Sequence, residues 1–149
     1  MIKLSQRDPQ WGDLKLGESN LTINRWGCTT TALSMLSDYF QSYFNPGELA
    51  TKILKYTKDG LIIWQSVNNI RHMAFEKRLY GRNDSEILKS LKDPTKAVIL
   101  EVDGKHWVTA VRKSLVGKSY KVADPWFGDI CTVPGRYKKI TGSSHFNHK

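Results

Sequence analysis

The chain lacks several features that would place it in a specialised class of protein. It has only two cysteines in 149 residues, so it carries no disulfide framework and cannot form a four-cysteine structural zinc site. No run of about 18 apolar residues is present, which predicts no membrane span. The first residues contain no apolar signal core, so we expect synthesis in a reducing cytoplasm. Without repeats, linkers or low-complexity segments, residues 1–149 are expected to form one domain.

Acidic residues are also scarce relative to basic ones. The chain has 23 Lys and Arg against 14 Asp and Glu, a formal net charge of +9. Such an excess favours an anionic partner, although it equally promotes solubility. Nucleic acid is not favoured, because the basic residues do not interleave with aromatic residues as in recognised nucleic-acid modules. There is no phosphate-binding glycine loop and no metal-hydrolase motif, so no cofactor or metal is expected.

Helical patterns fill the first part of the chain. Residues 5–27 have no regular period and are predicted to form turns. A helix then begins at Cys28, and its apolar residues recur at the spacing that buries one helical face. The expected helices cover Cys28 to Phe40, a segment capped by Asn45, Ile62 to Phe75, and a segment capped by Asn83 and Glu86.

After Pro94 the sequence becomes β-branched and apolar. Asp103-Gly104 is a two-residue hairpin signal between two such runs. The expected strands are 97–102, 106–112, 120–124, 130–133 and 137–140. The polar residues 142–149 are predicted to form a flexible tail. Helices followed by an antiparallel sheet indicate an α+β fold.

Cys28 is the first candidate for chemistry. It follows Gly27 directly and opens the first helical pattern, which places a thiol on the first turn of a helix. The unpaired N–H groups and the dipole at that position favour a thiolate, the nucleophile of cysteine hydrolases. A cysteine within an apolar pattern is more often an inert core residue. We interpret Cys131, within an expected strand, in this second way.

His106 and Asp124 are predicted to meet across a hairpin. They lie 18 residues apart on consecutive strands. A turn that pairs Lys113 with Gly117 would place the two residues directly opposite each other on one face. Asp124 would then accept the Nδ1 proton of His106 and leave Nε2 for a nucleophile. The same face would offer the helix led by Cys28 an apolar floor of Val108, Ala110, Tyr120 and Val122.

The motifs around these residues resemble those of papain-like cysteine peptidases. The segments concerned are Gln6-Arg7-Asp8-Pro9-Gln10-Trp11, Gly27-Cys28-Thr29-Thr30-Thr31-Ala32-Leu33-Ser34-Met35, His106-Trp107-Val108 and Val122-Ala123-Asp124-Pro125-Trp126. They are most similar to the bacteriocin-processing, double-glycine leader peptidases, in particular the stand-alone bacterial and phage members. The resemblance covers residues 4 to 133. It implies a papain-like fold with N-terminal helices packed on a C-terminal sheet, a Cys28–His106–Asp124 triad, and Gln6 as a side-chain donor to the oxyanion hole.

Two departures qualify what the resemblance implies. Gln6 lies 22 residues before the cysteine, as in stand-alone members but unlike the exporter-linked ones, and Asn24 is a rival donor. No transporter span accompanies the domain, so leader cleavage during export is not implied. The sequence alone does not assign a role to three of the tryptophans and three of the histidines. Trp26, Trp107 and Trp126 fit either a cleft or a core. His145 and His148 in the tail offer a weak metal-binding pattern, and His72 is expected to be solvated on the third helix.

The sequence therefore predicts a thiol hydrolase that cleaves a peptide bond in a peptide or protein substrate. One alternative is a phage-type lysin that cleaves cell-wall amide bonds, since a positive charge suits an anionic cell-wall polymer. The other is a catalytically idle papain-like domain that binds a peptide or protein partner.

Overall fold

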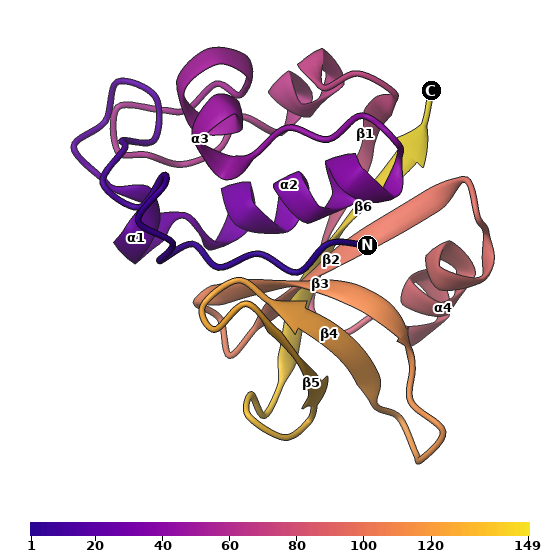
Figure 1. The fold of residues 1–149 in the computed structure, drawn as a ribbon. Coiled ribbons are helices and arrows are strands. Elements are labelled where there is room, and N and C mark those ends of the chain that lie inside the picture. The colour runs from indigo at the N-terminus through magenta and orange to yellow at the C-terminus, as the bar shows by residue number, and fades with distance from the viewer.

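A six-stranded antiparallel sheet organises the molecule (Figure 1). The computed structural model describes residues 1–149, and the strands follow the order β1-β6-β2-β3-β4-β5. The strands are β1 (Met73–Tyr80), β2 (Lys96–Val102), β3 (His106–Lys113), β4 (Tyr120–Asp124), β5 (Asp129–Val133) and β6 (Ile140–His148). The last strand of the chain thus lies inside the sheet, between the first strand and β2.

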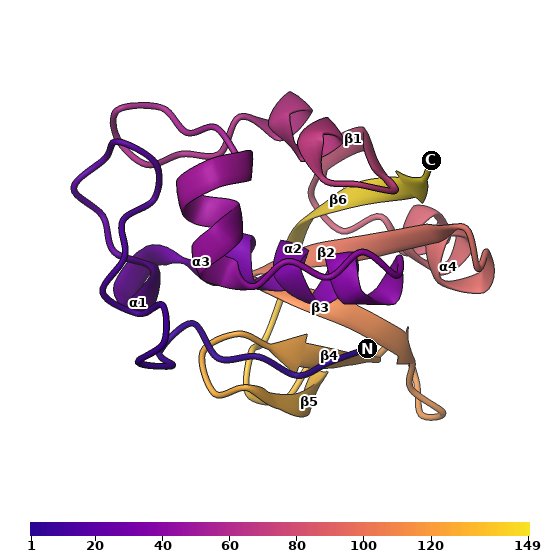
Figure 2. The same ribbon diagram turned by 45° about the horizontal axis from the view of Figure 1, so that its top comes forward.

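Helical elements cover both faces of this sheet (Figures 1 and 2). They are α1 (Ile23–Trp26), α2 (Cys28–Tyr39), α3 (Pro46–Glu48), a π-helical turn (Leu49–Ile53), a 3₁₀ helix (Trp64–Asn69) and α4 (Asp84–Lys92). The combination of helices with an antiparallel sheet confirms the predicted α+β class. None of the helices has the length and apolarity needed to cross a bilayer.

Helix α2 packs on the sheet face opposite to the one predicted. The hydroxyl of Thr109 donates to the carbonyl of Ala32 on α2 at 3.1 Å, and Leu33 and Leu36 lie in one buried cluster with Ile99. Neighbouring strand residues point to opposite faces, so Val108 and Ala110 face away from α2. The expected floor is instead covered by α4 through Ile87, in a cluster that includes Val108, Ala110, Tyr120 and Val122.

The predicted helix at 62–75 is wrong. Trp64–Asn69 is a short 3₁₀ helix, and β1 already begins at Met73. Val67, Ile70 and Met73 are fully buried at intervals of three residues. Only Val67 lies in the 3₁₀ helix, whereas Ile70 follows its end and Met73 begins β1. The spacing therefore imitates one face of an amphipathic α-helix across three different local structures. His72 breaks the pattern with a φ of 68° and lies in a turn, partly buried.

The predicted flexible tail is also wrong. Residues 142–148 belong to β6, which pairs with β1 on one side and β2 on the other. Ser143, Ser144 and His145 have no exposed surface. A polar segment can lie inside a sheet when both strand neighbours satisfy its backbone. The strand predicted at 137–140 does not form, because residues 134–139 are turn and loop and β6 begins at Ile140.

Two of the local turn and cap predictions are confirmed and one is not. Asn45 caps α3, since its side chain accepts the Glu48 N–H at 2.8 Å. Asp103 and Gly104 both have positive φ, 53° and 68°, as a two-residue hairpin turn requires. Asn83 precedes α4 but donates to the Tyr80 carbonyl and makes no cap hydrogen bond.

Candidate active site

Cys28 is the first residue of α2 and is partly buried. Gly27 joins it to α1, and a β-carbon at Gly27 would lie 2.6 Å from the carbonyl oxygen of Ile23. Glycine is therefore required for the sharp junction that separates the two helices. Backbone N–H groups in the first turn of a helix have no acceptor within it, so Cys28 stands beside free donors as predicted.

His106 and Asp124 are in contact, as predicted, but the ring is turned the other way. Nε2 of His106 lies 2.9 Å from Oδ1 of Asp124, so Nδ1 is the nitrogen that remains for Cys28. The Cys28 thiol interacts with the His106 side chain closely enough to affect its titration. The sequence predicts the reverse, with Nδ1 bound to Asp124 and Nε2 left for the nucleophile. The structure thus brings the three residues together with the two nitrogens exchanged.

A register shift in β3 separates this contact from the pairs near the β3–β4 turn. Near the turn Lys113 pairs with Tyr120, not with Gly117, while further along Ala110 pairs with Val122. The register therefore shifts by one residue at Val111, a β-bulge. If the register of the pairs near the turn continued along β3, Asp124 would lie opposite Thr109 and share the face that α2 covers. With the shift it lies opposite Val108, diagonal to His106 and on the same face.

Asp124 is fully buried and accepts four hydrogen bonds. Oδ1 accepts from His106 and from the Trp126 N–H at 2.9 Å. Oδ2 accepts from Arg136 at 2.8 Å and from the Tyr137 hydroxyl at 2.7 Å. Burial alone would raise the pKa of this carboxyl, but the donors of His106, Tyr137 and Arg136 outweigh it and hold the pKa well below its usual range. Asp124 is therefore ionised at neutral pH.

Arg136 and Tyr137 were not singled out in the sequence. They lie in the loop that precedes β6, and no local pattern connects them with a carboxylate 12 residues upstream. Arg136 also binds Asp129 through two bonds of 2.8 Å, and the Tyr137 ring lies 5.0 Å from the His106 ring. Both residues fix the Asp124 carboxylate in place and shield it from water.

His106 is basic for a histidine. Its burial favours the neutral ring, but the hydrogen bond with Asp124 and the neighbouring Cys28 side chain outweigh this effect and raise its pKa from 6.5 to about 9. At neutral pH the ring is therefore an imidazolium between a carboxylate and a thiol.

Gln6 lies between α1 and the turn that follows Asp124. Its backbone N–H donates to the Pro125 carbonyl at 2.7 Å, and its side-chain Nε2 donates to the Asn24 carbonyl at 3.1 Å. An amide nitrogen carries two hydrogens, so one donor remains after the bond to Asn24. Gln6 Oε1 is buried without a partner. Gln6 thus retains the donor that its predicted role requires, while the Asn24 side chain is held near Gly12.

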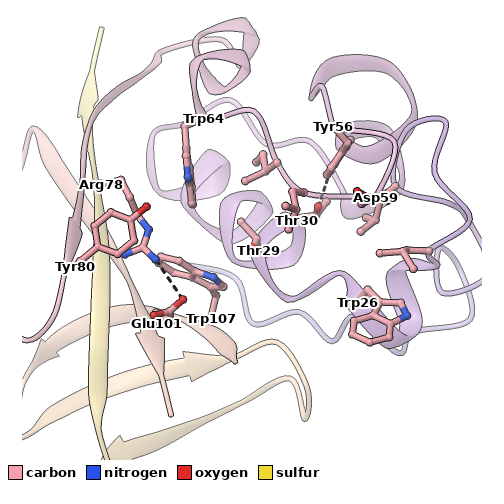
Figure 3. A pocket seen from close by; sticks show the side chains of 15 residues that line it. Trp26, Thr29, Thr30, Tyr56, Asp59, Trp64, Arg78, Tyr80, Glu101 and Trp107 are labelled. Atoms are coloured by element: carbon pink, nitrogen blue, oxygen red, sulfur yellow. Dashed lines mark hydrogen bonds and ion pairs between the residues drawn. The ribbon is translucent and has the colours of Figure 1, made fainter. Parts of the chain in front are cut away.

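A groove of about 390 Å³ begins at the chain neighbours of Cys28 and His106 (Figure 3). Cys28 and His106 do not line it, but their neighbours Thr29 and Trp107 do. Trp26 stands at the helical side of the groove and is 51% exposed. Figure 3 shows that the opposite side consists of sheet residues. The predicted cleft residues Trp26 and Trp107 therefore line it.

Trp126, the third predicted cleft residue, does not line this groove. The Arg7 guanidinium lies 4.6 Å from its ring, and its carbonyl accepts from Arg7 Nε at 2.9 Å. It therefore anchors the N-terminal arm. Among the groove residues that the sequence prediction missed are Trp64, Arg78, Tyr80 and Glu101. Arg78 and Tyr80 lie on β1, whose first residues were predicted to be helical, so that strand was not expected beside the site.

Arg78 organises the sheet side of the groove. Its guanidinium lies 4.1 Å from the Tyr80 ring and 4.8 Å from the Trp107 ring. It also pairs with Glu101 at 3.2 Å. A planar guanidinium stacked in this way is a rigid support for aromatic side chains. The groove therefore presents fixed aromatic surfaces on its sheet side, where the charges of Arg78 and Glu101 are paired with each other.

The remaining histidines and Cys131 lie outside the site. His145 is buried between the hydroxyls of Ser90, 2.7 Å from Nδ1, and Ser143, 2.8 Å from Nε2. The ring of His148 stacks on His72 at 5.4 Å. No group of three or more His, Cys, Asp or Glu side chains is arranged to hold a metal ion. Cys131 lies on β5 as predicted and is partly buried.

Comparison of the chain with family models, with curated proteins and with solved structures finds no match.

Proposed function

We propose that this chain is a papain-like thiol hydrolase that cleaves a peptide bond through a Cys28–His106–Asp124 triad. The observation that supports it most is the buried, ionised Asp124 bound to a histidine whose other nitrogen is left for a helix-terminal thiol. Burying a carboxylate costs desolvation free energy that its four donors must offset, which is more than a purely structural hydrogen bond to a histidine requires. Perturbed titration of this kind is typical of functional sites.

The proposed reaction begins with an ion pair of Cys28 thiolate and His106 imidazolium. The thiolate attacks the substrate carbonyl carbon, and the oxyanion that forms is stabilised by the backbone N–H of Cys28 and by Gln6. His106 then donates its Nδ1 proton to the leaving amine, and the carbon–nitrogen bond breaks. The products of this half-reaction are a free amine and a thioester on Cys28.

Hydrolysis of the thioester completes the cycle. A water molecule attacks the thioester carbonyl while His106 Nδ1 takes one of its protons. The carbon–sulfur bond breaks, the carboxylic acid product leaves, and the thiolate–imidazolium pair is restored. Asp124 keeps its negative charge throughout, because it stabilises the imidazolium by accepting from Nε2 and does not take the proton.

The groove beside the triad suits an extended peptide with a bulky apolar side chain. Its volume of about 390 Å³ lies in the range of ligand-binding clefts. Exposed apolar residues form its rim, with Leu61 at 68% and Tyr80 at 77% exposure. Large aromatic surfaces that remain exposed in the free protein gain most from burial under a ligand.

Cleavage of a cell-wall amide is the second candidate, favoured by the net charge of +9. The same triad chemistry applies to any amide, and anionic cell-wall polymers would be attracted to a basic protein. The third candidate is a catalytically idle domain that binds a peptide or protein partner. It differs from both enzymes because it would hydrolyse neither substrate.

The test compares wild type with Cys28→Ser on a peptide library and on a cell-wall preparation. We expect turnover to fall by a factor of about 10³ or more in Cys28→Ser, since triad members act as a unit. Asp124→Asn should also lower turnover, because it disturbs the orientation and charge of His106. Cys131→Ser is the matched control and should retain full activity. Equal activity of wild type and Cys28→Ser, or no hydrolysis by the wild type of either substrate, would contradict the proposal.

A further inference from the structure

The turn between β3 and β4 carries two exposed aliphatic side chains. Leu115 is 96% exposed and Val116 is 78% exposed, the highest values among the large hydrophobic residues of the chain. Figures 1 and 2 both show this hairpin extending beyond the body of the molecule. Its tip lies at the far end of β3 from His106, about 23 Å away along an eight-residue strand. The tip is therefore separate from the proposed active site.

Basic residues surround this apolar tip. Arg112, Lys113 and Lys118 are exposed, and none of them forms a salt bridge. The loop is held in shape by its own bonds. Lys113 Nζ donates to the carbonyls of Ser114 and Gly117 at 3.1 and 2.8 Å, and the Ser119 hydroxyl donates to the Val116 carbonyl at 2.6 Å. The side chains at the tip are thus presented outward on an ordered turn.

We propose that the β3–β4 hairpin tip, residues 112–118, docks the protein on an anionic lipid bilayer, with Leu115 and Val116 inserted between the headgroups. The basic residues would bind the lipid headgroups, each adding to the attraction near a negatively charged surface. Two aliphatic side chains would enter the boundary between headgroups and acyl chains. This inference concerns a surface that the proposed hydrolysis does not use, and it stands whether or not that proposal is correct.

The shape of the tip favours a bilayer over other anionic partners. A protein interface needs several hundred square ångströms on each side, which a narrow, convex turn does not provide. A hydrophilic polyanion would pair with the basic residues but would leave Leu115 and Val116 in water. A bilayer satisfies both features, because it accepts a small convex apolar wedge without a matching cavity.

Vesicle co-sedimentation tests the inference. Wild type should bind vesicles that contain phosphatidylglycerol and should not bind vesicles of phosphatidylcholine alone. The double variant Leu115→Ser/Val116→Ser should bind the anionic vesicles roughly tenfold or more weakly, since it loses the buried apolar contribution. Arg112→Gln/Lys118→Gln should bind more weakly and with a smaller salt dependence. Leu14→Ser and Lys3→Gln/Lys52→Gln, which alter exposed residues elsewhere, are the matched controls and should bind as wild type does.

A second measurement reports insertion directly. In Leu115→Trp the added fluorescence should shift to shorter wavelength with anionic vesicles and should be quenched by lipids with brominated acyl chains. Equal binding by wild type and the serine double variant would show adsorption by charge alone and would overturn the proposal. So would equal binding to neutral and anionic vesicles, or no vesicle binding by a wild type that binds soluble polyglutamate. Thiol labelling of Cys28 should be unchanged in every tip variant, which confirms that each one is folded.

Discussion

Acid should destabilise this protein through His145. The ring is fully buried, and burial, together with the nearby Lys77, lowers its pKa from 6.5 to about 4. The charged groups that face it are Lys77 and Glu76 on β1, Glu86 on α4 and Lys96 on β2. Because the folded pKa lies below the unfolded one, the unfolded chain binds a proton first as the pH falls. Stability from this group is therefore present above about pH 6.5 and is lost between about 6.5 and 4.

The size of this loss follows from the separation of the two pKa values. A pKa difference of one unit corresponds to about 1.4 kcal/mol. The fall of the His145 pKa from 6.5 to about 4 on folding therefore lowers the free energy of unfolding by about 3 kcal/mol between neutral pH and pH 4. The assay is urea unfolding of wild type and His145→Gln at several pH values. His145→Gln removes the titrating group at the cost of a constant packing loss, and the acidic residues common to both proteins cancel in the difference.

We expect the stability advantage of wild type over His145→Gln to shrink by about 3 kcal/mol between pH 7 and pH 4. His106 acts in the opposite direction, because its pKa is raised to about 9 and its stabilisation is lost as the pH rises above about 6.5. The two effects therefore occupy separate pH ranges. A difference between the two proteins that stays flat from pH 7 to pH 4 would refute the assignment of a neutral, desolvated His145.

Two further predictions concern the site. Cys28 should react with iodoacetamide at neutral pH at least about tenfold faster than Cys131, because an imidazolium neighbours Cys28 while burial raises the pKa of Cys131. Mass mapping of the labelled cysteines measures this, and His106→Ala should abolish the difference; equal rates in wild type would contradict the ion pair. Deletion of Val111 should remove the β-bulge but keep Ala110 opposite Val122, so Asp124 should stay on the face of His106 and Cys28 labelling should stay rapid. Deletion of Leu115 from the turn is its control, and labelling as slow as in His106→Ala after Val111 deletion would show that the site needs the bulge itself.

Patterns within short segments of the sequence were predicted well. The glycine before Cys28 and the periodic apolar residues after it located α2, and the Asp103-Gly104 turn located the β2–β3 hairpin. These features depend on the conformational preferences of a few adjacent residues. The errors at 62–75 and 142–149 arose where local patterns are ambiguous. Apolar residues three apart can lie on one helical face or, as here, in a 3₁₀ helix, a turn and a strand that follow one another. A polar strand is buried only because other strands flank it.

The candidate active site also combines features that local sequence determines with features that depend on tertiary contacts. The sequence by itself determined that a thiol begins a helix and that a histidine and an aspartate lie on consecutive strands. Only the tertiary structure decided which face they share, because one unpaired residue at Val111 exchanges the two faces of β3. It also brought Arg136 and Tyr137 onto Asp124 from a loop whose sequence contains no sign of this role. Side-chain direction along a strand depends on register, and register depends on the whole sheet, so the chemistry of this site is fixed by contacts that no local pattern specifies.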